Sequence, residues 1–342
     1  MKKLFALLLS LVMVFTATAA LGEGIKLGIV TPEADHGFTG ESVAHAQAEA
    51  EAMKAAGIIE DYRQVAAGEA SKQIQGIEEL LTWGPDVIVL WPTEGDQLRN
   101  AAQTIVDENI PLIIYDRLIE NFKGMAGEIM GDNEGIGNMM GEYLLKYFEE
   151  DLKAGKTVNY LLFIGDSSTV SKQRTQGMLD VINATEYKDQ FVLLQDGFQT
   201  DWSNAKSQEF MENWLTTADA ATIADLDMIV THDDEIIDGL MTVIKDNADL
   251  KDLRILTSVG GRRETLATFD EVTKPELLTY FFSPSYIREA LRLGVAAAKG
   301  ETYQDQKIEG QLFLIPTIEI DKNTVEAFRN SLEFADRYSI AD

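Results

Sequence analysis

The feature that most constrains the fold of this sequence is an alternation between short apolar runs and longer stretches of helical periodicity. Near the start of the chain, apolar runs of strand length occupy residues 25–30, 86–91 and 111–115. Stretches with apolar side chains at helical spacing occupy residues 40–56, 71–83 and 96–108. Because continuous apolar runs indicate strands buried on both faces, the alternation predicts a parallel sheet with helices on both sides.

The same alternation starts again further along the chain. Strands are expected at 157–164, 191–194, 226–230, 253–257 and 277–281. Helices are expected at 171–183, 202–215, 235–245 and 285–298. A chain of 342 residues is long enough for two domains, each with its own core. The sequence therefore predicts an α/β protein of two doubly wound units, and the Gly-rich stretch 127–137 between them suits a hinge.

The N-terminus has the three-part pattern of a secretory signal. Lys2 and Lys3 form a basic start, residues 4–15 are apolar apart from one serine, and small residues at 16–20 suit a signal peptidase. An apolar run of this length is too short to span a bilayer as a stable helix. The prediction is a signal peptide at residues 1–20, with a buried amphipathic helix as the alternative.

The chain contains no cysteine. This excludes disulfides, thiolate metal sites and cysteine nucleophiles. It also excludes the acylated cysteine that tethers an exported lipoprotein. We therefore expect the mature chain to be free in its compartment, most simply a bacterial periplasm.

The formal net charge is −28. A surface of this sign repels the phosphates of nucleic acids and anionic lipids, so nucleic acid is set aside as a partner. The same charge also serves simply to keep an exported protein in solution.

Candidate binding residues follow the strands of the first unit. In open α/β sheets, ligands bind beyond the carboxyl ends of the strands. Asp35 and Phe38 follow the first strand, Trp91 ends the second apolar run, and Asp116 and Arg117 follow the third. An adjacent acid and base can hydrogen-bond a polyol, or can form a local surface ion pair of little energetic value, and the spacing alone does not separate the two.

The second unit offers a similar set. Arg174 lies on its first helix, Trp202 follows the strand at 191–194, and Asp233 follows the strand at 226–230. Asp234 and Glu235 are more simply first-turn acids, which the helix dipole favours. Asp233 is therefore the better ligand candidate.

Aromatic rings among these polar groups point to a sugar. A sugar has an apolar C–H face, which a ring covers, and a rim of hydroxyls, which charged groups satisfy. Phe38 and Trp202 follow strand ends in polar surroundings and fit this role, whereas Trp83 and Trp214 have the spacing of core or surface residues.

Several segments, in the same order, resemble motifs of the ribose/galactose-binding type of periplasmic sugar-binding proteins. Residues 109–117 are similar to the family's NIPVI-x-x-DR segment, and 174–178 to its R-x-x-G-F helix. Shorter matches are 34–38 for N-N-P-F-F, 132–133 for the SDN hinge, and 233–235 for N-D-E. The resemblance runs from about residue 25 to the C-terminus.

The resemblance implies the type I periplasmic binding protein fold, with two lobes that close on a sugar and are joined by three crossings. The implied lobes are 21–131 with 283–311, and 132–282 with 312–342. A membrane permease of an ABC transporter would receive a monosaccharide from the closed form, and a chemoreceptor is left open as a further partner. The residues expected at the ligand are Asp35, Phe38, Trp91, Asp116, Arg117, Arg174, Trp202, Asp233, Gly260 and Ser283.

Two departures from the family pattern leave the particular sugar open. The family has an Asp in an F-D-G segment where this chain has Gly260, and Arg262 or Arg263 is placed to compensate. The family's Q-x-P segment reads Phe282-Ser283-Pro284 here, so the usual Gln is missing. The calcium loop of some relatives is not evident.

Catalytic patterns are missing from the sequence. There is no phosphate loop and no Gly-x-Ser-x-Gly elbow, and His36, His45 and His232 lack metal-ligand spacing. We therefore expect no metal, no cofactor and no catalytic residue. The alternative is an exported carbohydrate-processing enzyme that uses two of Asp35, Asp116 and Asp233 as paired acid and base.

Overall fold

The computed structural model describes residues 24–34, 37–245 and 247–331. The predicted signal peptide therefore lies outside the described residues, as do Asp35, His36 and the last part of the predicted second lobe. Within the described residues, no helix combines the length and apolarity needed to cross a membrane.

The first sheet has six parallel strands in the order β12-β5-β4-β3-β1-β2. These strands are β1 (Lys26–Thr31), β2 (Asp61–Ala66), β3 (Val87–Leu90), β4 (Leu112–Tyr115), β5 (Gly127–Gly131) and β12 (Gln311–Ile315). The central strands β3 and β4 are buried along their whole length, as expected for strands covered on both faces. We call this sheet and its helices the first lobe.

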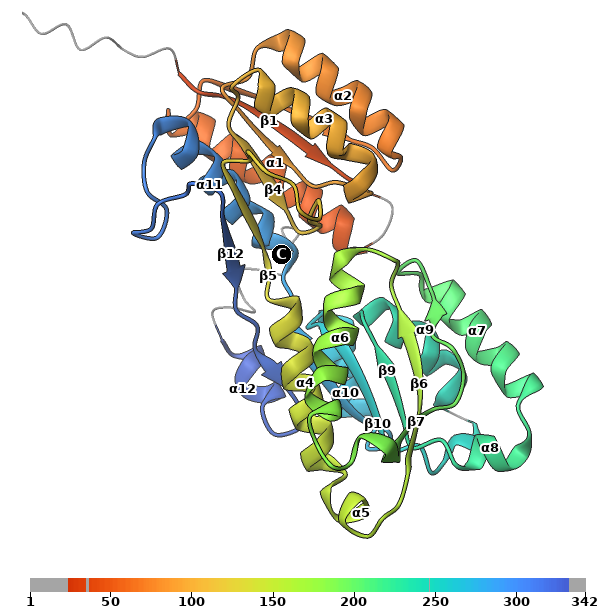
Figure 1. Ribbon diagram of the computed structural model, residues 1–342. Coiled ribbons are helices and arrows are strands. Elements are labelled where there is room, and N and C mark those ends of the chain that lie inside the picture. Colours follow the sequence, from red (N-terminus) through yellow and green to blue (C-terminus); the bar gives the residue numbers. More distant parts are fainter. Residues whose placement is uncertain (1–23, 35–36, 246, 332–342) are drawn as a thin grey trace, which may run out of the picture.

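Helices cover both faces of the first sheet. They are α1 (Gly37–Ala55), α2 (Ala70–Trp83), α3 (Gly95–Asp107) and α11 (Ile287–Lys299). Apolar residues of α1 and α11 pack on one face, and those of α2 and α3 pack on the other. Figure 1 shows these helices on the two sides of the sheet.

The second sheet has the order β13-β11-β10-β9-β6-β7, with β8 also paired to β6. Its strands are parallel except β13, which runs antiparallel to β11. They are β6 (Val158–Ile164), β7 (Phe191–Leu193), β8 (Phe198–Gln199), β9 (Met228–Thr231), β10 (Ile255–Gly260), β11 (Glu276–Phe281) and β13 (Glu319–Ile320). This sheet and its helices form the second lobe.

The helices of the second lobe also lie on both faces of their sheet. They are α4 (Asn133–Tyr147), α5 (Glu149–Lys153), α6 (Thr169–Asn183), α7 (Asn204–Thr217), α8 (Ala220–Ala224), α9 (Asp234–Ile244), α10 (Arg263–Glu271) and α12 (Val325–Arg329). Short 3-10 turns occupy Lys188–Gln190, Ala248–Leu250 and Pro284–Tyr286. Helices α4 and α6 pack on one face, and α7, α8 and α9 on the other. The predicted class, two doubly wound α/β units, is confirmed.

The chain passes between the sheets after β5, after β11 and between β12 and β13, as far as the described residues go. The predicted transition after Gln311 is wrong. It falls inside β12, which pairs with β5 from Gln311 to Ile315, so this strand belongs to the first lobe. β12 is an edge strand with mixed exposure, although residues 312–315 are all apolar.

The stretch 127–137, predicted to suit a hinge, contains the first crossing between the sheets, but most of it lies in regular elements. Gly127–Gly131 forms β5, and α4 begins at Asn133, so only Asp132 lies between regular elements. The small residues serve close packing instead. A Cβ at Gly131 would lie 2.0 Å from the ring of Phe282, and a Cβ at Gly137 would lie 2.4 Å from the carbonyl oxygen of Arg174.

Candidate functional site

A pocket lies where the carboxyl ends of the strands of both sheets meet. Its empty space is about 530 Å³, including the part open to solvent. It is lined by Phe38, Thr39, Trp91, Asp116, Arg117, Val170, Arg174, Trp202, Asp233, Val259, Gly260, Arg262 and Phe282. Eight of the ten predicted ligand residues are therefore brought together around one gap.

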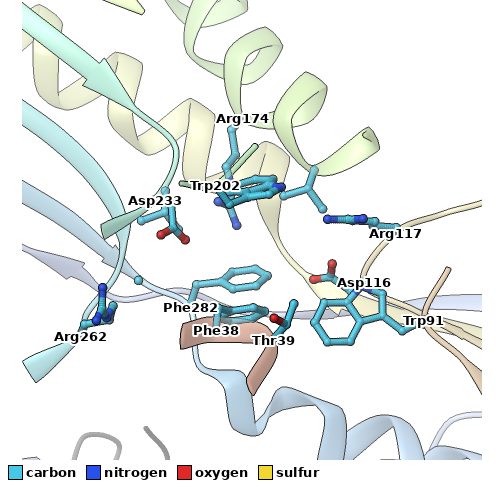
Figure 2. A pocket seen from close by; sticks show the side chains of 13 residues that line it. Phe38, Thr39, Trp91, Asp116, Arg117, Arg174, Trp202, Asp233, Arg262 and Phe282 are labelled. Carbon is cyan, nitrogen blue, oxygen red and sulfur yellow. The ribbon is translucent and has the colours of Figure 1, made fainter. Parts of the chain in front are cut away.

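The aromatic side chains form two walls of this pocket. Figure 2 shows Phe38 and Phe282 on one side of the gap, with Trp202 across from them. The rings of Phe38 and Phe282 are 5.5 Å apart between centroids, and Trp91 meets Phe38 edge to face at 6.0 Å.

Trp202 is held in a backbone conformation that bulky residues rarely adopt. Its φ is 61°, in the left-handed region. Its ring lies so close to Gly165 that a Cβ there would be 2.3 Å from ring atoms. Its Nε1 donates to Oδ2 of Asp166 over 2.9 Å. The ring is thus fixed by backbone, packing and a hydrogen bond together.

Asp116 follows β4 and places a buried carboxyl in the pocket. It is 4% exposed and has φ 63°, and Oδ1 has no hydrogen-bond partner among the described residues. Burial raises its pKa to about 6, against the opposing charges of Arg117 and Arg174. A ligand hydroxyl that donates to Oδ1 would satisfy this atom.

Arg117 does not form the surface ion pair that the sequence left open. Its side chain is largely buried, Nη1 donates to the carbonyl of Thr93 over 2.7 Å, and Nη2 lies 3.0 Å from Oδ2 of Asp166. Asp166 belongs to the second lobe, so this ion pair links the two lobes beside the pocket that Arg117 lines.

Arg174 projects from α6 and is 3% exposed. Its Nε donates to Oδ1 of Asn133 over 2.8 Å, and Nη1 donates to the carbonyl of His232. Its guanidinium lies 4.7 Å from the ring centroid of Phe282, which is a cation–π distance. Burial lowers the pKa of Arg174 to about 10, so it remains charged at neutral pH. Asn133 starts α4, and this bond therefore ties the arginine to a crossing between the lobes.

His232 is not a metal ligand candidate in this arrangement. Burial and the nearby Arg174 lower its pKa to about 3, and its Nε2 lies 3.1 Å from the hydroxyl of Thr175. Among the described residues, no cluster of His, Asp and Glu has the arrangement of a metal site.

Asp233 caps α9 and also faces the pocket. Its Oδ1 accepts from the backbone N–H of Glu235 over 2.8 Å. Burial raises the pKa of Asp233 to about 8, and the neighbouring Asp234 adds to the rise. The group is therefore mainly a protonated acid at pH 7 in the empty pocket.

Asp234 explains why the family's missing acid has no room at position 260. Its carboxylate accepts from the hydroxyls of Ser258 and Thr279 and from the backbone N–H of Gly261. A Cβ on Gly260 would lie 2.6 Å from Oδ2 of Asp234. The sequence indicated only a helix-start acid at this position, whereas the structure makes it the centre of a buried network.

Arg262 lies at the pocket end nearest Asp233, as Figure 2 shows. Its Nη1 is 2.9 Å from Oδ2 of Asp238 on α9. Of the two arginines that the sequence placed near this gap, Arg262 therefore lines it.

Ser283 was predicted at the ligand, but it does not line the pocket. Its side chain is fully buried, and its Oγ lies 2.8 Å from Oγ of Ser285 in the turn after β11. The residue before it, Phe282, faces the pocket instead. Phe282 follows a strand end, so the strand-end rule applied at β11 would have found it. Thr39, Val170 and Val259 were also missed and carry no chemical signal in the sequence.

Comparisons with known proteins bear on the family and the fold of this chain. A family model of the periplasmic binding protein domain matches residues 27–302. The D-xylose-binding periplasmic protein of Haemophilus influenzae is 23% identical over 271 residues, which cover 77% of each chain. The ribose import binding protein of Escherichia coli is 24% identical over 177 residues, 51% of this chain and 54% of that protein.

Solved structures share the fold. The Caulobacter myo-inositol binding protein, bound to myo-inositol, superposes with a TM-score of 0.75 at 17% identity, over 92% of this chain and 98% of that chain. At this identity the likeness speaks for the fold alone.

Proposed function

This chain belongs to the periplasmic binding protein family, and from that premise we propose that it captures a neutral sugar or a related polyol between its lobes and delivers it to an ABC transporter permease. The closed form, with the ligand enclosed, is the state that the permease would recognise. The names of the relatives support export to the periplasm and a role in import.

One observation carries the proposal: aromatic walls and buried polar groups from both lobes surround one gap. The rings of Trp202 and Phe38 offer stacking surfaces to the C–H face of a sugar. The unpartnered Oδ1 of Asp116 needs a donor, which a hydroxyl provides. The free face of the Arg174 guanidinium offers a donor toward the same gap.

The charges in the pocket favour a neutral ligand. Arg117 and Arg262 already have acidic partners in Asp166 and Asp238. The remaining positive charge, on Arg174, interacts with the carboxyl of Asp116. Asp233 is mainly protonated because its pKa is raised, so it adds little negative charge. An anionic or cationic ligand would leave a buried charge uncompensated.

A panel of pentoses, hexoses and polyols tests the proposal. A ligand that binds only the folded chain raises its melting temperature, and calorimetry then gives the affinity and a stoichiometry of one. We expect at least one neutral sugar or polyol to bind and to be recovered unchanged. Absence of binding across the panel would refute the proposal, and conversion of the sugar to a product would instead support the exported carbohydrate-processing enzyme.

A further inference from the structure

We propose that Asp166 is a positioning residue that couples closure of the two lobes to the placement of the Trp202 ring. The inference deepens the proposed function and rests on it, because Trp202 is the wall of the proposed ligand site. Asp166 does not itself line the pocket, and it was not among the predicted ligand residues although it follows the strand predicted at 157–164.

A single carboxylate oxygen carries both contacts. Oδ2 of Asp166 accepts from Nε1 of Trp202 over 2.9 Å and lies 3.0 Å from Nη2 of Arg117. Trp202 and Asp166 belong to the second lobe, and Arg117 to the first. The indole is therefore one atom away from a contact that exists only while the lobes are together.

Asp166 is itself held in place from the second lobe. Its Oδ1 accepts from the backbone N–H of Ser168 over 2.9 Å, and its own backbone N–H donates to Oγ of Ser171 over 3.2 Å. Burial alone would raise the pKa of Asp166, but Arg117, Ser168 and Trp202 outweigh it and hold the pKa below its usual value. The carboxylate stays ionised and ready to meet the guanidinium at neutral pH.

Arg117 is equally fixed from the first lobe. Its other terminal nitrogen, Nη1, donates to the carbonyl of Thr93. Opening the lobes separates Arg117 from Asp166 and leaves both groups to water, whereas closing them rejoins the pair in a largely buried place. A charge pair of this kind contributes more than an exposed one.

A second ion pair across the lobes provides the contrast. Lys172 of α6 lies 3.6 Å from Glu120 of the first lobe, and both side chains are more than half exposed. Solvent screens such a pair, so it adds little to closure. Because it joins the two lobes, the pair is nevertheless a suitable reporter of how often they meet.

The test measures closure without any ligand. Because the chain has no cysteine, Glu120→Cys with Lys172→Cys gives two unique thiols that a short bis-maleimide can bridge only in the closed form. In this background, Asp166→Asn keeps the size of the side chain but removes the charge that Arg117 meets. Its single amide oxygen can accept from the indole or from the N–H of Ser168, and not from both. We expect cross-linking to slow by about threefold to tenfold.

Matched variants separate coupling from local damage. Asp201→Asn makes the same change beside Trp202, in an exposed ion pair with Lys206 within one lobe, and should leave the rate unchanged. Arg117→Met should slow cross-linking as much as Asp166→Asn, and the double variant no further. The proposal would be overturned if Asp166→Asn left the cross-linking rate unchanged, or if Asp201→Asn slowed it equally. It would also be overturned if the effects of Asp166→Asn and Arg117→Met were additive.

The ligand found in the panel gives a second readout. Asp166→Asn should raise the dissociation rate about tenfold and change the association rate little, since the pair forms after encounter. In a Trp202→Phe background, which lacks the indole N–H, the effect of Asp166→Asn should shrink to the part that Arg117 carries. A fall in melting temperature with unchanged dissociation would mean that Asp166 only supports the local fold. Failure of all sugars to bind would refute the proposed function while leaving the cross-linking result to decide the role of Asp166.

Discussion

At the scale of single residues, the pocket contains acids that the fold holds in unfavourable states. Asp116 is buried in a left-handed conformation with an unpartnered oxygen, and Asp233 keeps its proton near neutral pH. Groups of this kind reduce the stability of the empty protein and are retained for binding.

Asp233→Asn tests this conflict between stability and binding. An acid with a raised pKa binds its proton more tightly in the folded chain than in the unfolded one, so its contribution to the free energy of unfolding is full below pH 4 and is lost as pH rises toward 8. The asparagine variant lacks that loss. We expect it to gain about 1–3 kcal/mol over the wild type between pH 4 and pH 8, measured by urea unfolding without ligand, while its affinity for the sugar falls.

Asp201→Asn is expected to change the free energy of unfolding in the opposite direction. Its hydrogen bond with Lys206 lowers the pKa of Asp201, so this acid stabilises the fold above pH 4 and the variant should lose stability there. A difference between Asp233→Asn and wild type that stays constant over the whole pH range would contradict the pKa of about 8.

The sequence predicts residues that combine a strand end with a distinctive side chain. Asp116, Arg117 and Asp233 are found this way, because the end of a buried strand fixes where the next side chains point. Phe282 and Asp166 also follow strand ends but were not predicted. Phe282 continues an apolar run, and Asp166 meets Arg117 from 49 residues away in the chain, a pairing that only the tertiary fold creates.

At the scale of elements, the contact between α4 and α6 positions the pocket arginine. Both helices present glycine where they touch, so that a Cβ on Gly177 would lie 2.6 Å from the carbonyl oxygen of Glu134. Close approach of the two backbones brings Asn133 at the start of α4 within reach of Arg174 on α6. The arginine is thus oriented by helix packing as well as by its hydrogen bonds.

Gly137→Ala tests the role of this contact. The new Cβ would lie 2.4 Å from the carbonyl oxygen of Arg174, which is backbone and cannot move aside without shifting the helix. We expect a loss of about 1–3 kcal/mol in urea unfolding and a weaker affinity in calorimetry, since Arg174 moves with α6. Gly40→Ala in α1 has open space around it and should be neutral or slightly stabilising. Full affinity in Gly137→Ala would show that the contact between α4 and α6 does not determine the position of Arg174.

Central elements are easier to predict from the sequence than edge elements. β3 and β4 are apolar along their whole length and stand out, whereas β2 and β12 lie at the two edges of the first sheet with mixed exposure. An edge strand needs no continuous apolar run, because one side of it meets solvent or a loop. For that reason β2 had no predicted range. β12 has a continuous apolar run at 312–315, and the predicted lobe boundary nevertheless divided it.

At the scale of the whole molecule, the crossings between the lobes are themselves part of the pocket. The ring of Phe282, just after β11, packs onto Gly131 at the end of β5 and also lines the gap beside Arg174. In Figure 1, β5 and β12 run side by side from the first lobe toward the second. Motion at the crossings therefore reaches the aromatic wall directly.

Gly131→Ala separates this coupling from simple loss of stability. The added Cβ would lie 2.0 Å from the Phe282 ring, so the ring has to turn or the two strands have to part. We expect the dissociation constant for the sugar to rise about tenfold although no polar pocket residue has changed, and small-angle scattering of the bound form to show a larger radius of gyration than in the wild type.

Gly127→Ala, four residues earlier in the same strand, meets the methyl group of Ile308 at 3.0 Å and lies away from the pocket. It should reduce stability and leave affinity and compactness unchanged. If both variants weaken binding equally, the crossing acts only through the stability of β5, and the aromatic wall moves independently of the hinge.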